Sequence, residues 1–287
     1  MLSWQIILYI VSSGMFFSLL SVGFGLTLRS VKFFNLAYGG AFLVGGYTMF
    51  WLYRTLSISF LPSLVISGMT AGFYLLLTYQ FVFKILFHRK AKNLVLLIAS
   101  LGLLTATSAI LGMIFGNQPT IIARHLSDIG VIDIFGGTLN IVEAVIVATS
   151  LLVIPLLAYV RSKTRFGRAT RAIEDDIEVA ELVGIPKEKT LKKIFFVSGV
   201  CAGLGGIMLG FNVGIIPASG LIYMLPTIVA VVIGGMQSFW GGVLGAFVLT
   251  LAQQLTIVVF GGSWVQAVPF IILIVMLLVR PAGILKR

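Results

Sequence analysis

The stretch "IFFVSGVCAGLGGIMLGFNVGIIPASGL", residues 194 to 221, opens the segment that decides the fold of this chain. The segment runs for 86 residues, from 194 to 279, without one Asp, Glu, Lys, Arg or His. One helix needs roughly 20 apolar residues to cross a bilayer, so this segment is long enough for several crossings. It therefore indicates an integral membrane protein.

The rest of the chain has the same character, since 59% of its 287 residues are hydrophobic and only 10% are charged. Soluble domains carry about 25% charged residues. Spacing of the β-strand type is absent, and in lipid only helices then satisfy the backbone. The predicted fold class is all-α, with one transmembrane domain over residues 1–287. Further uncharged runs lie at 4–28, 33–53, 55–83 and 93–123, and the run at 139–160 holds one carboxylate, Glu143.

The placement of the basic residues predicts the orientation of the chain in the membrane. Eighteen of the 20 Lys and Arg residues fall into four clusters, and two residues, Arg54 and Arg124, lie apart. Putting all four clusters in the cytoplasm places the N-terminus outside and the C-terminus inside. The net charge of +11 is therefore explained by topology, and no nucleic-acid partner is expected. The clusters are Arg29 with Lys32, Lys84 to Lys92, Arg161 to Lys193, and Arg280 to Arg287.

This orientation predicts about nine transmembrane helices, with eight to ten as the range. Five crossings precede the cytoplasmic loop 161–193, and an external loop lies at 116–138. Four more crossings fit into 194–279 if the helices break near Pro217, Gly234 to Gly242, and Gly261 to Gly262. The piece 222–236 is short for a full span, which suggests a half-helix of the kind that transporters use.

The cytoplasmic loop contains "RAIEDDIEVAELVGIPKEK", residues 171–189, with six of the nine acidic residues of the chain. One helix drawn through it has an apolar arc that includes Ile173 and Ile177, opposite an acidic arc that includes Glu174. Gly184 is placed to end this helix in the left-handed conformation. The remaining members are Val183 and Ala180 on the apolar arc and Glu178 and Glu181 on the acidic arc.

Two interpretations of this helix are open. It could lie on the lipid surface, to which the basic flanks would hold it, but surface helices on anionic lipid favour Lys and Arg on their polar face. It could instead dock on a cytoplasmic partner, with Ile173, Ile177 and Val183 filling a groove in that partner. The acidic polar face favours docking.

Three stretches resemble the permease subunits of branched-chain amino acid ABC importers, called LivH-type. They are "FNLAYGGAFLVGGY" at 34–47, residues 171–189, and "IVAVVIGGMQSFWGGVLGAFV" at 228–248 with "VRPAGIL" at 279–285. The resemblance implies cytoplasmic ATPase subunits, a second permease subunit, an external solute-binding protein and the inner membrane of a prokaryote. It also implies a coupling helix that seats in the ATPase, formed here by Ile173, Ile177, Glu178, Ala180, Glu181 and Gly184.

The solute is less closely specified by this resemblance. Relatives commonly have His in an "NFAHG" pattern where this chain has Tyr38, and the wider family includes permeases for urea and short amides. The resemblance implies a branched-chain or similar amino acid as the solute. Permeases for urea or short amides are the alternative within the family, and a secondary carrier or channel is the alternative outside it.

An enzyme is the weakest reading of the sequence. No "GK" dipeptide occurs, so no phosphate-binding loop is present to hydrolyse ATP. His88 and His125 fall on opposite sides of the membrane in the expected topology and cannot share a metal. No catalytic residue, metal or other cofactor is predicted, and transport energy is expected from a separate subunit.

Polar residues within the spans are candidates for the translocation path, because each costs free energy unless it faces water or a partner. We expect Asn35, Tyr38, Gly39 and Gly40 to line it, together with Gln237 at a second break. The alternative is that Asn35 caps a helix and the glycines allow close packing. Glycine pairs four residues apart also predict close helix packing, at Gly68 and Gly72, Gly199 and Gly203, Gly206 and Gly210, and Gly241 and Gly245.

Overall fold

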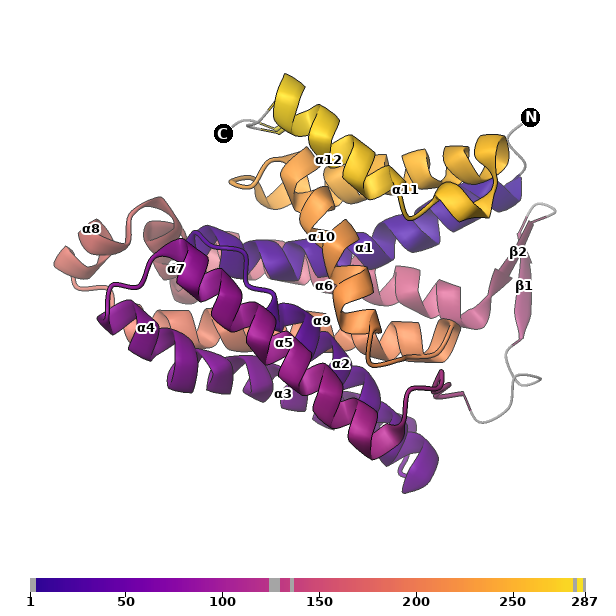
Figure 1. Cartoon of the computed structure of the whole chain (residues 1–287), viewed down its shortest axis with the longest axis horizontal. Coiled ribbons are helices and arrows are strands. Elements are labelled where there is room, and N and C mark those ends of the chain that lie inside the picture. The colour runs from indigo at the N-terminus through magenta and orange to yellow at the C-terminus, as the bar shows by residue number, and fades with distance from the viewer. Residues whose placement is uncertain (1–3, 124–129, 135–136, 281–282, 286–287) are drawn as a thin grey trace. The chain divides into compact units, whose positions relative to one another are not determined.

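The computed structural model describes residues 4–123, 130–134, 137–280 and 283–285, and this part of the chain is predominantly helical (Figure 1). The all-α prediction is confirmed. In chain order the helices are α1 (Trp4–Val31), α2 (Ala37–Met49), α3 (Phe60–Thr78), α4 (Lys84–His88), α5 (Asn93–Phe115), α6 (Ile141–Lys163), α7 (Arg165–Asp175), α8 (Ile177–Leu182), α9 (Lys187–Asn212), α10 (Ser219–Gly234), α11 (Phe239–Phe260) and α12 (Val268–Val279). Two π-helical segments extend α2 (Phe50–Thr55) and join α3 to α4 (Tyr79–Phe83).

Within the described residues, six helical segments are long and apolar enough to cross a bilayer. Helices α2, α10 and α12 are shorter, with 13, 16 and 12 residues. The predicted count of about nine crossings is therefore not confirmed by helix length and composition. The six segments are Trp4–Val31, Phe60–His88, Asn93–Phe115, Ile141–Lys163, Lys187–Asn212 and Phe239–Phe260.

The uncharged segment 194–279 is broken where its Gly and Pro residues predicted. Pro217 lies between α9 and α10, and α10 ends at Gly234. Helix α11 ends at Phe260, and the following residue, Gly261, has a left-handed φ of +84°. At about 1.5 Å per residue, α10 is roughly 24 Å long, which is less than the bilayer core of about 30 Å. The expectation of a short helix here is confirmed.

A small β-hairpin departs from the expectation that strands are absent. Strand β1 (Val131–Ile134) pairs antiparallel with β2 (Gly137–Asn140), and Val131 lies opposite Asn140. The hairpin occupies the end of the predicted external loop. Short antiparallel strands can face water there, which they cannot do in lipid.

The chain forms two compact units, and helices α1, α6 and α10 contribute residues to both. Unit 1 consists of Met1–Gly25, His125–Pro155 and Leu225–Arg287. Unit 2 consists of Leu26–Arg124 and Leu156–Met224.

The centre of unit 2 is built from α2, α3 and α9, which pack against one another (Figure 1). Glycines bring the backbones together: a Cβ added to Gly206 would lie 1.9 Å from the carbonyl oxygen of Phe42. A Cβ on Gly45 would lie 2.4 Å from the Cα of Gly203. No side chain fits at these points, so the predicted close packing is confirmed for this part of α9.

In unit 1, glycines also bring the backbones of α10 and α11 close together. A Cβ on Gly245 would lie 1.9 Å from the carbonyl oxygen of Ala230. A Cβ on Gly241 would lie 2.5 Å from the carbonyl oxygen of Gly234. The predicted pair of Gly241 and Gly245 therefore also marks close packing of helices.

Candidate functional site

The acidic loop folds as two helices, α7 and α8, where a single helix was expected. Asp176 separates them with an extended backbone (φ −151°, ψ 120°). Its Oδ1 atom accepts hydrogen bonds from the backbone N–H groups of Glu178 (2.8 Å) and Val179 (3.1 Å). Asp favours such an N-cap over a helix interior, because its short side chain competes for backbone donors. The arcs drawn for one continuous helix therefore fail beyond Asp176.

A tight turn leads from α6 into α7. The Thr164 hydroxyl oxygen accepts a hydrogen bond from the Gly167 N–H (3.1 Å) and caps α7. A Cβ on Gly167 would lie 2.3 Å from the carbonyl oxygens of Val160 and Arg161. Only glycine allows α7 to start this close to the end of α6.

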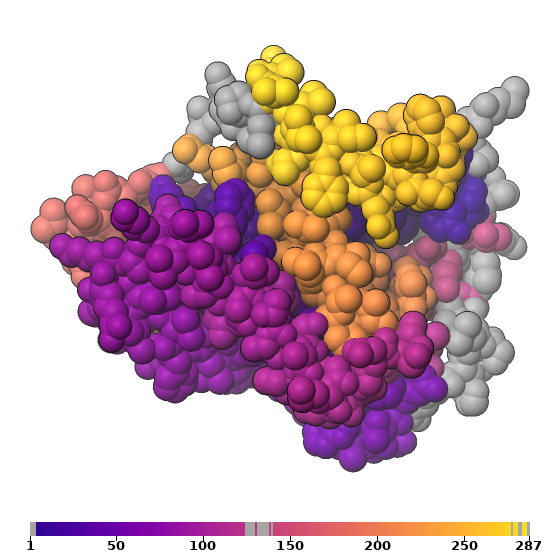
Figure 2. All heavy atoms as spheres, in the orientation of Figure 1, coloured from indigo at the N-terminus to yellow at the C-terminus, as the bar shows by residue number. Residues whose placement is uncertain are grey.

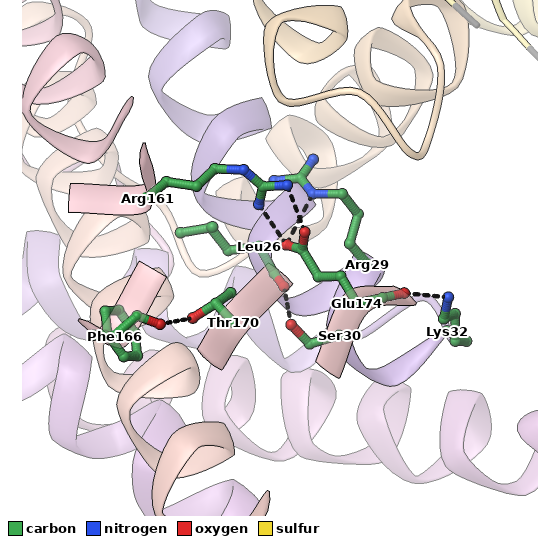
Figure 3. A network of polar contacts seen from close by, with 8 residues as sticks. All are labelled: Leu26, Arg29, Ser30, Lys32, Arg161, Phe166, Thr170 and Glu174. Atoms are coloured by element: carbon green, nitrogen blue, oxygen red, sulfur yellow. Dashed lines mark hydrogen bonds and ion pairs between the residues drawn. The ribbon is translucent and has the colours of Figure 1, made fainter. Parts of the chain in front are cut away.

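Glu174 is the anchor of α7, although the sequence pattern placed it on the exposed acidic arc. Its side chain is only 4% exposed and binds the Arg161 guanidinium through two contacts, Oε1 to Nη1 at 2.7 Å and Oε2 to Nη2 at 2.6 Å (Figure 3). The Nε atom of Arg29 donates to Oε1 at 3.2 Å. The expectation of a solvent-facing Glu174 is wrong, because two guanidinium groups hold its carboxylate in a buried, charge-assisted network.

Lys32 makes a further contact with the same residue. Its Nζ atom donates to the backbone oxygen of Glu174 at 2.6 Å (Figure 3). Lys32 directly follows α1 and has a φ of +59°, a left-handed value that is uncommon for Lys. The end of α1 and the end of α6 therefore both hold α7.

Helix α8 has a different surface. Three apolar side chains are exposed on it or directly after it: Val179 (55%), Leu182 (86%) and Val183 (70%). The predicted coupling residues Ile173 and Ala180 are buried within this chain, so they are not part of an exposed docking surface. The other predicted coupling residues remain accessible, with Ile177 half-buried and Glu178, Glu181 and Gly184 exposed.

Gly184 ends α8 as predicted. Its φ is +85°, its N–H donates to the Glu181 carbonyl (3.1 Å), and the Ile185 N–H donates to the Ala180 carbonyl (3.0 Å). These two bonds form a Schellman motif. A Cβ at Gly184 would meet no atom within 4 Å, so the backbone conformation alone selects glycine.

Asn35 lies at the start of α2 and is fully buried. Its Oδ1 atom accepts a hydrogen bond from the Ala37 N–H (3.2 Å), while its Nδ2 atom is buried without a hydrogen-bond partner. The capping alternative is therefore present in the structure. The unpaired amide donor is a feature that a cap alone does not require.

The other predicted path residues lie in both units. Tyr38, Gly39 and Gly40 are buried in unit 2, and a Cβ on Gly39 would lie 2.6 Å from the carbonyl oxygen of Gly220. Gly39 thus allows α2 to pack closely against the start of α10, whereas a Cβ on Gly40 would lie 2.5 Å from the hydroxyl oxygen of Tyr74 on α3. Gln237 belongs to unit 1, where it is exposed in the loop between α10 and α11.

A cavity of about 590 Å³ in unit 2 was missed by the sequence reasoning. Its walls are α5, which forms part of the visible surface in Figure 2, and the residues around the start of α10. The Ser108 hydroxyl donates to the Pro217 carbonyl (2.7 Å) beside it. No three His, Cys, Asp or Glu side chains in the described part of the chain lie close enough to hold a metal ion. The lining residues are Leu104, Thr105, Ser108, Ala109, Gly112, Met113, Asn117, Pro217, Ala218, Leu221 and Ile222.

Residues 6–277 match the model of the family described as "Branched-chain amino acid transport system / permease component". The chain belongs to this family. It is 25% identical to the "High-affinity branched-chain amino acid transport system permease protein LivH" of Escherichia coli (strain K12), over 96% of this chain and 93% of that protein. It is 31% identical to the "Probable branched-chain amino acid transport permease protein LivH" of Methanocaldococcus jannaschii, over 93% of this chain and 87% of that protein.

A solved structure shares the fold. The chain from "PsaBC from Streptococcus pneumoniae in complex with Fab" aligns with a TM-score of 0.51 at 13% identity, over 98% of this chain and 94% of that one. The family match and the apolar helices identify a multi-pass membrane permease component. The resemblance seen in the three sequence stretches is thereby confirmed.

Proposed function

We propose that this chain is the membrane subunit of an ABC importer and forms the path for a branched-chain amino acid. An external binding protein delivers the solute, separate cytoplasmic ATPase subunits drive transport, and a second permease subunit completes the pore. The observation that carries the ATPase part of the proposal is the exposed apolar surface of Val179, Leu182 and Val183, which protrudes from an otherwise anchored loop.

This surface suits a protein groove better than a lipid surface. Leu182 is 86% exposed, and Glu178 and Glu181 lie exposed beside it. An apolar side chain framed by carboxylates fits an apolar groove with a basic rim. The inner leaflet is negatively charged and would repel the same carboxylates.

We also propose the inner membrane of a prokaryote, an external N-terminus, a cytoplasmic C-terminus and nine crossings. Contacts within unit 2 support the grouping of charges. Residues assigned to the cytoplasm meet one another, as Lys84 does with Glu188 at 2.8 Å. Arg54, assigned to the outside, donates to the carbonyl oxygen of Ile121 in the external loop.

Cysteine labelling tests this topology. Single cysteines at Lys90 and Ser162, in a Cys201→Ser background, are expected to be shielded from an impermeant thiol reagent in intact cells. A cysteine at Asp128 is expected to react. Labelling of the Lys90 or Ser162 position from outside would contradict the orientation.

For the path itself we propose Asn35, Tyr38, Gly39, Gly40 and Gln237. The buried, unpaired Nδ2 atom of Asn35 supports its part, because a passing carboxylate could accept a hydrogen bond from it. Asn35→Ala should lower solute transport more than it lowers the amount of folded permease in the membrane. An equal loss of both would leave Asn35 as a helix cap only.

Reconstitution tests the function as a whole. Vesicles that contain this permease and its companion permease should accumulate leucine only when ATPase subunits, ATP and the external binding protein are all supplied. Accumulation by this chain alone under a sodium or proton gradient would show a secondary carrier instead. Leucine, urea and a short amide compared in the same vesicles would test the solute class.

A further inference from the structure

Glu174 differs from every other acidic residue of segment 171–189, because it is buried while the other five are exposed. A carboxylate is rarely kept out of water unless cations and hydrogen bonds compensate it. Both oxygens of Glu174 are engaged by side chains of this chain, so the residue does not present its charge to a docked partner. Its contribution is internal to the permease.

The contacts of Glu174 join α7 to the end of the preceding helix α6 and to the end of α1, which is distant in sequence (Figure 3). Arg161, at the end of α6, binds both carboxylate oxygens of Glu174. Arg29 in the last turn of α1 binds Oε1, and Lys32, just after α1, binds the backbone carbonyl. Both α1 and α6 are long and apolar enough to cross a bilayer. One residue of the cytoplasmic loop is therefore tied to two candidate membrane spans.

Helix α8 has weaker side-chain connections of its own. Its ion pair, Glu181 with Lys187, is 3.8 Å long and largely exposed, and such pairs contribute little. A displacement of α8 can therefore pass along the chain in two directions. One route leads through Asp176 into α7, and the other leads through Gly184 into α9.

We propose that Glu174 is a positioning residue that transmits movement of the docked loop to α1 and α6. This inference rests on the proposed function, because it assumes that an ATPase moves α8. Bidentate guanidinium pairing holds a carboxylate in both distance and direction, so α7 cannot slide without displacing Arg161. Loss of the charge at Glu174 would leave the loop docked but loosely joined to these two helices.

The backbone of Lys32 independently marks the same junction. A non-glycine residue with φ of +59° is held there by its surroundings, and such conformations concentrate at functional sites. The Nζ atom of the same residue donates to the backbone oxygen of Glu174. The end of α1 is thus shaped to reach α7.

The test compares Glu174→Gln with Asp175→Asn, which neutralises the adjacent, exposed carboxylate on the same helix. Each variant is assembled with its ATPase subunits, companion permease and binding protein in vesicles. We expect both variants to retain the ATPase subunits. In E174Q the leucine transported per ATP hydrolysed should fall about fivefold or more, the lower end of typical coupling between distant sites. In D175N this ratio should stay at the wild-type value, and Glu174→Asp should restore part of it.

Each other outcome has a definite meaning. An unchanged ratio in E174Q overturns the inference, and so does loss of the ATPase subunits, which would make Glu174 a docking residue. Absence of ATP-driven transport in the wild-type complex would overturn the proposed function, and the inference would fall with it because it rests on that function. If E174Q fails to insert, Arg161→Lys decides: Lys keeps the positive charge but cannot bind both oxygens of Glu174 in the planar fork, so an unchanged ratio overturns the inference.

Discussion

Helices α7 and α8 are consecutive in the chain, yet they are built for opposite environments. Helix α7 buries Ile173 and Glu174 and is fixed to the ends of two long helices. Helix α8 exposes Leu182 and buries only Ala180 among its six residues. The first belongs to the framework of the permease, and the second is held outside it, accessible to a partner.

The cap between them produces this difference. Asp176 interrupts the helix and redirects the chain, so that α8 need not continue the buried face of α7. Without the interruption, an apolar stripe at helical spacing would lie on one side of a single rod. Because the helix is interrupted, anchoring and presentation are assigned to separate helices, and mutations should separate the two roles.

The largest effect is expected from Ile173→Ala. Ile173 is fully buried, and removal of such a side chain typically costs about 2–5 kcal/mol. Thermal unfolding of the purified permease should show the loss. Leu182→Ala on α8 is the matched control and should leave stability within about 0.5 kcal/mol. Equal destabilisation by the two changes would remove the distinction between the helices.

Leu182→Asp should have the opposite effect to Ile173→Ala: it should weaken binding of the ATPase subunit and leave the stability of the permease unchanged. An apolar anchor at the centre of an interface contributes about 2 kcal/mol or more, so affinity for the ATPase subunit should fall about 30-fold. Unfolding of the permease alone should be unaffected, because Leu182 is exposed. Binding of the purified ATPase to the permease in nanodiscs measures the change, and Leu182→Met is the control. Wild-type affinity in the Asp variant would exclude α8 as the docking helix.

Gly184→Val should have a smaller effect on the same interface. A left-handed backbone costs a residue with a Cβ roughly 1–2 kcal/mol, which would distort the end of α8. Gly184→Asn should be nearly neutral, since Asn tolerates this conformation. Retention of ATPase subunits during purification should follow the order Gly, Asn, Val. If the Val variant retains the ATPase subunits fully, the conformation of the end of α8 is not required for their binding.

The smallest effect is expected from Asp176→Ala, which removes the cap of α8. Loss of an N-cap costs about 1 kcal/mol, whereas Asp176→Ser keeps a side-chain acceptor. Hydrogen exchange of the Glu178 and Val179 amides should accelerate in the Ala variant and stay near the wild-type rate in the Ser variant. Unchanged exchange in both variants would mean that the surroundings, and not the cap, hold α8 in place.

Local signals in the sequence predicted much of this structure. The uncharged run gave the membrane class, and Gly and Pro gave the breaks around Pro217, Gly234 and Gly261. Gly184 was recognisable because a glycine two residues before a proline is a common way to end a helix. Each of these features depends on residues close together in the chain.

The anchoring of the loop could not be predicted in this way. The partners of Glu174 are Arg161, 13 residues away, and Arg29, 145 residues away. In the sequence Glu174 is indistinguishable from the exposed acids beside it. The helical arc also assumed one rod, and the cap at Asp176 invalidated it. The path residues stay a proposal, since burial of Asn35 fits both a cap and a lining residue.

The glycine contacts of unit 2 have a consequence for the sequences that this fold can accept. At Gly206 the space for a methyl group is already taken by the backbone of Phe42, so even Ala should be rejected there. At Gly102 on α5 an added Cβ would meet no atom within 4 Å. A saturation library should therefore accept only glycine at position 206 and apolar side chains of many sizes at position 102, although both are glycines inside apolar helices.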